Sequence, residues 1–541
     1  LGLELVARYL ERKPNLSLAK TRQRLGLKHK SLKQFSEDMT AQRGVIAAFE
    51  LSWNELDKDA QELGCLLSLF ASAPTPWDLV EKCLSDVDEE ELEDRRDKLI
   101  NSSLLQYVGG SNYGLHPLIW QYFRNKLAEF DSSAEDMKHS ICKVVAGSAM
   151  AIPESITVQQ VNEVEVYIPH IVEVAENLHE YLSDDDLITP FNRLGWFYKG
   201  QGLYPQAQLW FEKGKETAEQ RFGNEHRDVA TSLNDLALLY SYQGRYDEAE
   251  PLYLQALEMS KKLLGDEHPE VATALNNLAN LYESQGRYDE AEPLYLQALE
   301  MRKKLLGDEH PHVATTLNNL ATLYWGQGKY EKAEPLSLQA LEMCKKLLGD
   351  EHPNVAQSLN NLALLYESQG RYDNAESLYL QALEMFKKLL GNEHPSVATS
   401  LNNLAYLCYN QGRYDEAEPL YLQALEMFKK LLGDEHPSVA TSLNNLAHLC
   451  YNQGKYDQAE PLYLQSLEMR KKLLGDEHPD VATSLHNLAS LYKDQGKYDQ
   501  AEPLYLQSLE MRKKLLGDEH PHTQRTQKSY QALLEKKKRL R

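Results

Sequence analysis

Apolar residues recur along most of the chain at the spacing of amphipathic helices. In the segment 271–282, Val271, Leu275, Leu278 and Tyr282 fall on one face of such a helix. A second apolar stripe follows at positions 291, 294, 295, 298 and 299. The pattern predicts two consecutive helices, each of which buries one face against its neighbours.

Glycine, proline and acidic residues mark the expected ends of these helices. Gly286 is expected to end the first helix and Gly307 the second, because glycine readily adopts the left-handed geometry of a helix C-terminus. Asp289, with a glutamate three residues later, resembles a capping box and predicts the start of the second helix. Pro293 is then expected in the first turn of that helix, and Pro311 is expected to open the next one.

The helix pair repeats with a period of 42 residues. Each copy ends in a Glu-His pair, and the histidines are His226, His268, His310, His352, His394, His436, His478 and His520. Seven near-identical copies fill 227–520, and a degenerate copy precedes them at 185–226. One helix pair cannot bury its own apolar face, so neighbouring pairs are expected to stack into a superhelical solenoid with a concave groove.

We therefore predict an all-α solenoid of eight helix pairs over 185–541. The expected repeats are 185–226, 227–268, 269–310, 311–352, 353–394, 395–436, 437–478 and 479–520, closed by a capping helix at 521–541.

These repeats resemble a known family. The degenerate copy carries Leu194-Gly195-x-x-Tyr198, Gly202, Tyr204, Ala207 and Phe211 at the spacing of the tetratricopeptide repeat signature. The 42-residue period and the Leu-Gly-Asp-Glu-His-Pro linker are similar to those of kinesin light chains and many bacterial relatives. The resemblance implies that the first helix of each pair lines the concave wall.

Comparison of the copies with one another locates a candidate binding surface on the first helices. Three positions of each first helix vary while the apolar skeleton stays constant, and Trp325, Tyr406, Tyr409, His448 and Tyr451 occupy such positions. Exposed aromatic residues are typical anchors of binding surfaces. We predict that these side chains select a ligand; the alternative is drift on a solvent-exposed face.

A constant asparagine lies beside the variable positions. It is present as Asn277, Asn319, Asn361, Asn403, Asn445 and Asn487. An asparagine amide both donates and accepts, so it can pair with a peptide group. Stacked helices lie about 8–10 Å apart and an extended peptide advances ~3.3 Å per residue, so one asparagine could serve about every third residue. We predict a ladder that holds a peptide backbone, as the resemblance to kinesin light chains also implies; the alternative is hydrogen bonding between adjacent repeats.

The regularly spaced histidines are not expected to bind metal. Metal ligands must converge within about 2.1 Å of one ion, whereas these histidines are separated by whole repeats. A structural role in the connecting loop is predicted instead.

Before residue 185 the period is lost. Helical segments are followed by a short hairpin, Leu105–Val108 with Tyr113–Leu115 across a Gly-Gly turn, and this order predicts a winged-helix domain over 42–132. Residues 133–184 are expected to form a helical linker to the solenoid.

This amino-terminal region also resembles a known family. The phrases Ser52-Trp53-x-x-Leu56, Leu69-Phe70-Ala71 and Leu115-His116-Pro117-Leu118 are similar to the end of the NB-ARC ATPases of the STAND class. Residues 1–41 resemble the end of that family's helical subdomain. The family's Met-His-Asp motif aligns here with a histidine followed by proline. The resemblance implies that His116 contacts a nucleotide, together with an upstream domain missing from this chain; the alternative is an ordinary histidine of a winged helix.

Composition and motifs exclude several functions. The chain has no G-x-x-x-x-G-K-[ST] phosphate loop and no recognisable catalytic constellation, so we expect no enzyme activity and no cofactor in this chain, although the intact protein could bind ADP or ATP. A net charge of −23 argues against a nucleic-acid partner. No apolar run reaches the ~18 residues of a membrane span. Six scattered cysteines and the lack of a signal pattern favour a cytoplasmic protein.

The sequence predicts a scaffold that binds a protein or peptide ligand in its concave groove. We expect it to be the sensor arm of a STAND-type switch that self-associates through an upstream ATPase domain. One alternative is a constitutive cargo adaptor similar to kinesin light chain. A second is an ADP binder that uses the NB-ARC remnant.

Overall fold

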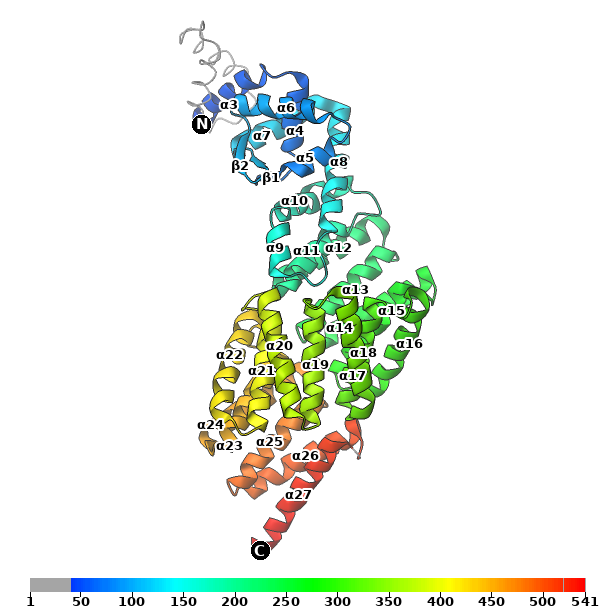
Figure 1. The fold of residues 1–541 in the computed structure, drawn as a ribbon, viewed down its shortest axis with the longest axis vertical. Helices are drawn as coiled ribbons and strands as arrows, with labels where there is room; N and C mark the ends of the chain where they lie inside the picture. The colour runs from blue at the N-terminus through cyan, green and yellow to red at the C-terminus, as the bar shows by residue number, and fades with distance from the viewer. Residues whose placement is uncertain (1–39, 519, 541) are drawn as a thin grey trace. The chain divides into compact units, whose positions relative to one another are not determined.

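The computed structural model describes residues 40–518 and 520–540, so most of the segment 1–41 that resembles an NB-ARC subdomain lies outside the described residues. The chain divides into two compact units (Figure 1). One contains the described residues up to Pro153 together with Gln160–Leu194. The other contains Glu154–Gln159 and the chain from Gly195 onward.

The first unit begins with helices and a small sheet. The elements are α3 (Thr40–Trp53), α4 (Lys58–Leu67), β1 (Thr75–Pro76), α5 (Trp77–Cys83), α6 (Glu89–Asn101), β2 (Gln106–Gly109), β3 (Asn112–Gly114) and α7 (Pro117–Lys126). The predicted hairpin is confirmed, since β2 and β3 pair antiparallel with Tyr107 opposite Tyr113. The strand β1 adds to the other edge of β3, in the order β1-β3-β2, which the sequence did not indicate. The winged-helix assignment stays a prediction.

The predicted linker 133–184 is divided between the two units: 133–153 and 160–184 belong to the first, and Glu154–Gln159 belongs to the second. The elements that follow α7 are η1 (Leu127–Phe130), α8 (Asp131–Ala149), α9 (Val158–Val164), α10 (Ile168–Glu173), η2 (Val174–Leu178) and η3 (His179–Tyr181). The buried His170 accepts a hydrogen bond at Nδ1 from the Ala71 amide (3.2 Å), and its Nε2 donates to the Pro74 carbonyl (3.0 Å). Burial lowers the pKa of His170 to about 4, so this histidine stays neutral and ties α10 to the loop before β1.

The second unit contains the predicted solenoid. The pairs are α11 (Thr189–Gly200) with α12 (Tyr204–Phe222), α13 (Arg227–Tyr242) with α14 (Tyr246–Leu264), α15 (Pro269–Ser284) with α16 (Tyr288–Leu306), α17 (Pro311–Gly326) with α18 (Tyr330–Leu348), α19 (Pro353–Ser368) with α20 (Tyr372–Leu390), α21 (Pro395–Asn410) with α22 (Tyr414–Leu432), α23 (Pro437–Asn452) with α24 (Tyr456–Leu474), α25 (Pro479–Asp494) with α26 (Tyr498–Leu516), and the cap is α27 (Pro521–Leu540). The prediction of eight 42-residue helix pairs and a capping helix is confirmed.

The helix ends follow the glycines, but the predicted capping box is wrong. Gly286 and Gly307 have φ of +75° and +87°, as a left-handed C-terminus requires. The Arg287 amide donates back to the Tyr282 carbonyl (2.8 Å), so the chain reverses at once and α16 starts at residue 288. Asp289 therefore lies inside the first turn, where its charge favours the helix dipole, and Pro293 lies in the helix interior rather than in the first turn.

The repeated histidines cap the first helices. In His268, Nδ1 accepts a hydrogen bond from the Glu270 amide at 3.2 Å, and the proline that follows the histidine opens α15. The same bond recurs in the other copies from His226 to His520. The His-Pro pair is thus a helix-start signal, since the imidazole satisfies an amide that the helix leaves unpaired.

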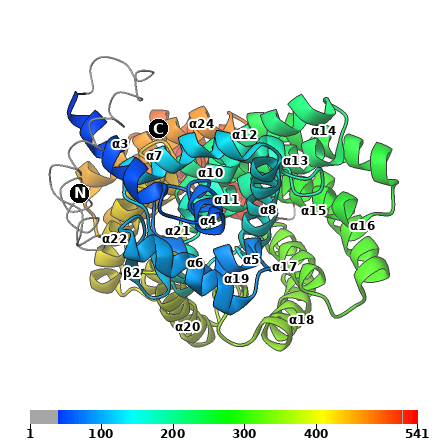
Figure 2. The same cartoon turned by 90° about the horizontal axis from the view of Figure 1, so that it is seen from above.

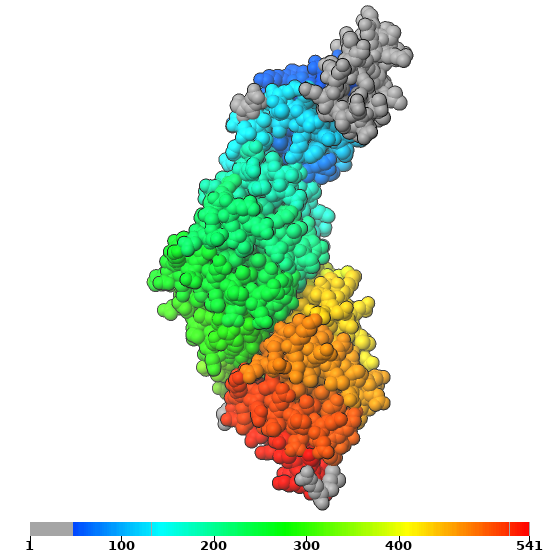
Figure 3. Space-filling view, turned by 180° about the vertical axis from the view of Figure 1, so that it is seen from behind, coloured from blue at the N-terminus to red at the C-terminus, as the bar shows by residue number. Residues whose placement is uncertain are grey.

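The array winds far enough to meet itself. Figure 2 shows α14 to α24 following one another around a circuit, and Figure 3 shows early repeats bordering late ones. Four histidines form the seam: His394 bonds the Gly200 carbonyl, His436 that of Tyr242, His478 that of Ser284, and His520 that of Gly326. We call this set of contacts the inter-turn seam. It adds contacts between repeats that are not neighbours along the chain.

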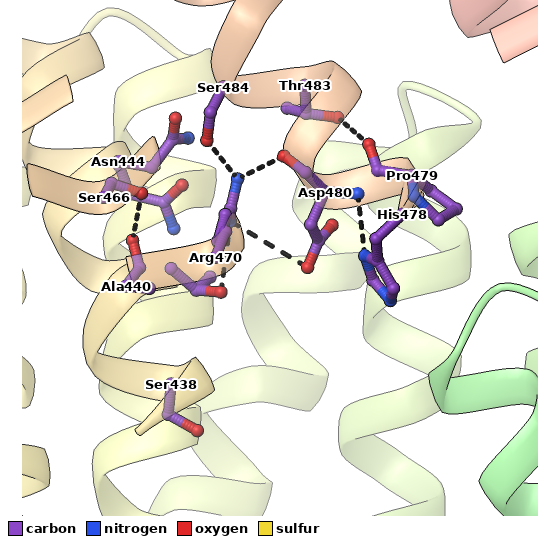
Figure 4. Close-up of polar contacts among 12 residues, drawn as sticks. Ser438, Ala440, Asn444, Ser466, Arg470, His478, Pro479, Asp480, Thr483 and Ser484 are labelled. Carbon is purple, nitrogen blue, oxygen red and sulfur yellow. Dashed lines mark hydrogen bonds and ion pairs between the residues drawn. The ribbon is translucent and has the colours of Figure 1, made fainter. Parts of the chain in front are cut away.

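A buried arginine strengthens three of the repeats. Figure 4 shows Arg470 of α24, which is 3% exposed. Its Nη1 donates to the Asp480 carbonyl and to Ser484 Oγ, both at 2.9 Å, and its Nη2 donates to Thr441 Oγ1 at 3.2 Å. Arg302 and Arg512 make the equivalent bonds in their repeats. These arginines join each second helix to the first helices on both sides of it.

Candidate functional site

The constant asparagines lie half-buried on the first helices, where each bonds the preceding repeat. Asn277 Nδ2 donates to Asn234 Oδ1 at 3.2 Å, and Asn403 Nδ2 donates to Asn360 Oδ1 at 3.4 Å. The other members, Asn319, Asn361, Asn445 and Asn487, donate to Asn276, Thr322, Asn402 and Asn444. The structure therefore contains the inter-repeat bonding that the sequence left as an alternative.

These bonds use one of the two N–H groups of each amide. These hydrogen bonds are long, so each orients its amide but contributes little to the free energy of folding. Asn487 is only 8% exposed, which leaves little of this member for a ligand. It stays a prediction that the remaining asparagines hold a peptide backbone. The neighbouring repeat would already orient their amides for that role.

The variable positions are linked across repeats in a regular register. A side chain at one variable position bonds a side chain 43 residues further on, at another variable position of the next repeat. The pairs are Trp325 Nε1 to Ser368 Oγ (2.8 Å), Asn410 Nδ2 to Glu367 Oε1 (2.7 Å), Asn452 Nδ2 to Tyr409 OH (2.5 Å) and Tyr451 OH to Asp494 Oδ2. We call this series the cross-repeat ladder. In the sequence, the signal for this ladder was the matching of polar residues 43 positions apart.

Four of the predicted site residues form one aromatic strip across α21 and α23. The rings of Tyr406 and Tyr409 stack with centroids 6.1 Å apart. Tyr409 lies 5.0 Å from His448, and His448 lies 6.1 Å from Tyr451. Trp325 lies two repeats earlier, on α17, and does not join the strip. Tyr406 is 37% exposed, so the strip offers aromatic surface to a ligand.

The strip faces a cation from the capping helix. The guanidinium of Arg525 in α27 acts electrostatically on Tyr406 and Tyr409, although three repeats separate them along the chain. Burial, together with the nearby charge of Arg525, lowers the pKa of His448 to about 4. Figure 2 shows α15, α17, α19 and α21 nearer the centre of the circuit than α16, α18, α20 and α22. We call the side of these first helices that carries the variable positions the inner wall.

Two carboxylates on this wall were not among the predicted site residues. Glu283 in α15 and Glu367 in α19 occupy the same variable position as Trp325 in α17. Tyr295 OH donates to Glu283 Oε2 at 2.8 Å, and the equivalent tyrosine of α20 donates to Glu367 at 2.9 Å. Burial raises the pKa of Glu283 to about 8 and that of Glu367 to about 7. Their alternation with a tryptophan was the sequence signal that could have identified them.

A separate hollow lies beside the inter-turn seam. It has a volume of about 350 Å³, and Lys199, Tyr242, Gln357, His394 and His436 are among its lining residues. Among the described residues, no three His, Cys, Asp or Glu side chains are grouped so that they could hold a metal ion.

His116 caps a helix in the first unit. Its Nδ1 accepts a hydrogen bond from the Leu118 amide at 3.2 Å, and Pro117 opens α7. This is the same His-Pro device that starts the first helices of the repeats. The nucleotide contact that the family resemblance implies for His116 stays a prediction.

No described helix is both long enough and apolar enough to span a bilayer. Comparison with curated proteins gives no match.

Solved structures include several similar arrays. A candidate kinesin light chain of Podosopora anserina with nearly identical repeats is 31% identical over 38% of this chain and 97% of its own, with a TM-score of 0.31. A Rap protein complexed with the competence and sporulation factor is 16% identical over 71% of this chain and 99% of its own, with a TM-score of 0.51, which shows a shared fold. A STAND signal-transduction ATPase with a tetratricopeptide repeat sensor from Pyrococcus horikoshii is 15% identical over 88% and 74%, with a TM-score of 0.43.

The tetratricopeptide repeat model matches in seven overlapping windows: 186–262, 228–304, 270–346, 312–388, 354–430, 396–472 and 438–514. Together they cover more than half of the chain and coincide with the helix pairs described above. The chain belongs to the tetratricopeptide repeat family.

Proposed function

We propose that the inner wall of the first helices binds an extended peptide or a segment of a partner protein. The observation that carries this proposal is the aromatic strip of Tyr406, Tyr409, His448 and Tyr451, which is partly exposed on the first helices α21 and α23. Rigid aromatic side chains offer a large contact area at a low cost in conformational entropy. The cross-repeat ladder holds them in place, so a ligand would find the surface already formed.

A selection experiment tests this proposal. The chain is immobilised and a displayed library of random 12-residue peptides is passed over it; we expect a family of peptides that binds saturably. The double variant Tyr409→Ala/Tyr451→Ala should weaken binding of these peptides by tenfold or more. Leu422→Ala is the matched control, because Leu422 is 49% exposed on the second helix α22. If no peptide depends on the tyrosines, the inner wall is not the binding surface.

We further propose that groove occupancy is the input of a STAND-type switch. Support comes from the resemblance of the amino-terminal region to the end of the NB-ARC ATPases. His116 fits a contact with a phosphate group, because Nδ1 is used by the helix cap and Nε2 is left to donate. In a protein that carries the ATPase, ATP hydrolysis should change when a selected peptide is added, and this change should disappear in Tyr409→Ala/Tyr451→Ala. Unchanged hydrolysis would favour the constitutive adaptor instead.

A further inference from the structure

We infer that the inner wall selects a peptide with a basic side chain about five residues from an aromatic or aliphatic one. The basic side chain would lie on Trp325 beside Glu283, and the apolar one on the aromatic strip. This inference rests on the proposed function and specifies the chemistry of its ligand.

The indole of Trp325 is a cation site without a cation. Four other tryptophans of the described chain carry a Lys or Arg over the ring at 4.5–5.4 Å, namely Trp77, Trp120, Trp196 and Trp210. Among the residues that the structure describes, no Lys or Arg side chain lies over the ring of Trp325. Its Nε1 donates to Ser368 Oγ at 2.8 Å, which orients the ring. The side chain packs partly against the core, and its remaining surface is open to a ligand. A cation within about 6 Å of an indole centroid is attracted to its face.

Carboxylates stand at the same position on either side of that indole. The cross-repeat partner position of Glu283 is occupied by Gly326, which has no side chain, so the ladder is interrupted there. One oxygen of Glu283 accepts from Tyr295, and the interruption leaves the other oxygen without a ladder partner. Glu367 is 5% exposed and both of its oxygens accept hydrogen bonds, so Glu283 is the carboxylate that meets the ligand. A ligand cation beside Glu283 would offset the cost that burial imposes on its ionised form, which a neutral group would not do.

Arg525 determines which end of the wall takes the basic side chain. This guanidinium acts on Tyr406, Tyr409 and His448, so a basic ligand group would be repelled from the aromatic strip. Glu283 lies on α15, three repeats before α21, whereas Glu367 on α19 lies in the repeat next to the strip and is already hydrogen-bonded there. Charge therefore sets the register of the ligand, and the strip is left for an apolar side chain.

Repeat geometry sets the spacing between the two ligand side chains. Trp325 and Tyr409 occupy equivalent positions two repeats apart. At about 8–10 Å per repeat this separation is roughly 16–20 Å, which an extended peptide spans in about five or six residues.

The experiment uses the full chain and the same random 12-residue display library. We expect the peptides selected by the wild type to be enriched in Lys or Arg five or six residues from Phe, Tyr, Trp or Leu. In fluorescence anisotropy with a labelled selected peptide, Glu283→Gln should weaken binding at least tenfold. Glu300→Gln should change it less than twofold, because this glutamate is exposed on the second helix α16.

A change in the ligand gives a second test that cannot disturb the fold. Replacing the peptide's Arg by citrulline, or its Lys by norleucine, should weaken binding to the wild type at least tenfold. Selected peptides without basic enrichment, or unchanged affinity after this replacement, would overturn the inference while the peptide-binding function stands. Failure to select any peptide that depends on Tyr409 and Tyr451 would overturn the proposed function itself, and with it this inference.

Discussion

The imidazole Nε2 of His394 donates a hydrogen bond to the Gly200 carbonyl oxygen, 194 residues earlier in the chain, at 3.1 Å. The other nitrogen, Nδ1, accepts from the Ser396 amide at 3.1 Å. Both nitrogens are therefore used, and only the neutral tautomer with a proton on Nε2 satisfies both bonds. The helix cap and the inter-turn seam depend on the same ring.

Acidification should weaken the seam. Burial lowers the pKa of His394 to about 4 and also lowers the pKa of His436, whereas a histidine in the unfolded chain has a pKa of about 6.5. The unfolded chain thus binds protons first, and the seam's contribution to stability is complete above about pH 6.5 and falls as the pH drops toward 4. Thermal unfolding of the wild type should show this loss.

The variant His394→Asn/His436→Asn separates the seam from the carboxylates that titrate in the same range. Asparagine can still cap a helix but lacks a ring nitrogen to reach the earlier repeat. We expect this variant to be less stable at pH 7 and to lose less stability between pH 6.5 and 4.5. An identical pH dependence in the two proteins would contradict this role of the histidines.

Gly244→Ala should destabilise the array more than Gly454→Ala. These glycines are equivalent, with φ of +72° and +75°, so both substitutions cost about 1–2 kcal/mol of left-handed strain. A methyl group at residue 244 would also come within 2.5 Å of Pro437 across the seam, whereas one at residue 454 would meet nothing within 4 Å. Urea unfolding gives the loss in the free energy of unfolding for each variant. The difference between the two losses reports the seam contact alone. Equal losses would mean that the turns do not touch in solution.

Arg470→Ala should lower the free energy of unfolding by about 3 kcal/mol, because it leaves the Asp480 carbonyl and Ser484 without their donor and opens a cavity. Arg470→Phe should cost much less, since Phe386 and Phe428 occupy the equivalent position in other repeats. Urea unfolding compares the two variants. Equal losses would show that the bonds of the guanidinium, rather than its volume, stabilise the repeat.

The constant asparagines can be tested for both of their roles at once. Asn403→Ala removes one inter-repeat bond and should cost about 0.5–1.5 kcal/mol of stability. If this amide also holds a ligand backbone, the variant should weaken all selected peptides by a similar factor, whatever their side chains. Loss of stability with unchanged peptide affinity would assign Asn403 to the solenoid alone.

Local signals made the helix pairs predictable. Helical periodicity, the left-handed glycines such as Gly286 and the prolines that open the first helices act within one repeat. The capping box at Asp289 was wrong because the tight turn at Arg287 starts the helix sooner than side-chain capping would. A two-residue difference at a helix end depends on backbone geometry that propensity does not encode.

The relationships between repeats were harder to predict. The inter-turn seam depends on small rotations that accumulate over more than four repeats, and no single repeat encodes it. The cross-repeat ladder could have been found from paired variation at a spacing of 43, as in Trp325 with Ser368 and Glu367 with Asn410. The raised pKa of Glu283 could not have been predicted, since it follows from the burial of its side chain in the folded array.

The 194-residue distance between His394 and Gly200 lies between four and five periods of the array. A shorter array would never complete a turn, and its trough would stay open along one side. Each copy added beyond that length docks against an earlier copy as well as its neighbour, which closes the array into a sleeve. A peptide bound as proposed would enter this sleeve from its ends. Unequal recombination between near-identical copies would change the copy number in whole periods. It would therefore lengthen or shorten the sleeve and keep the contacts of the inter-turn seam in register.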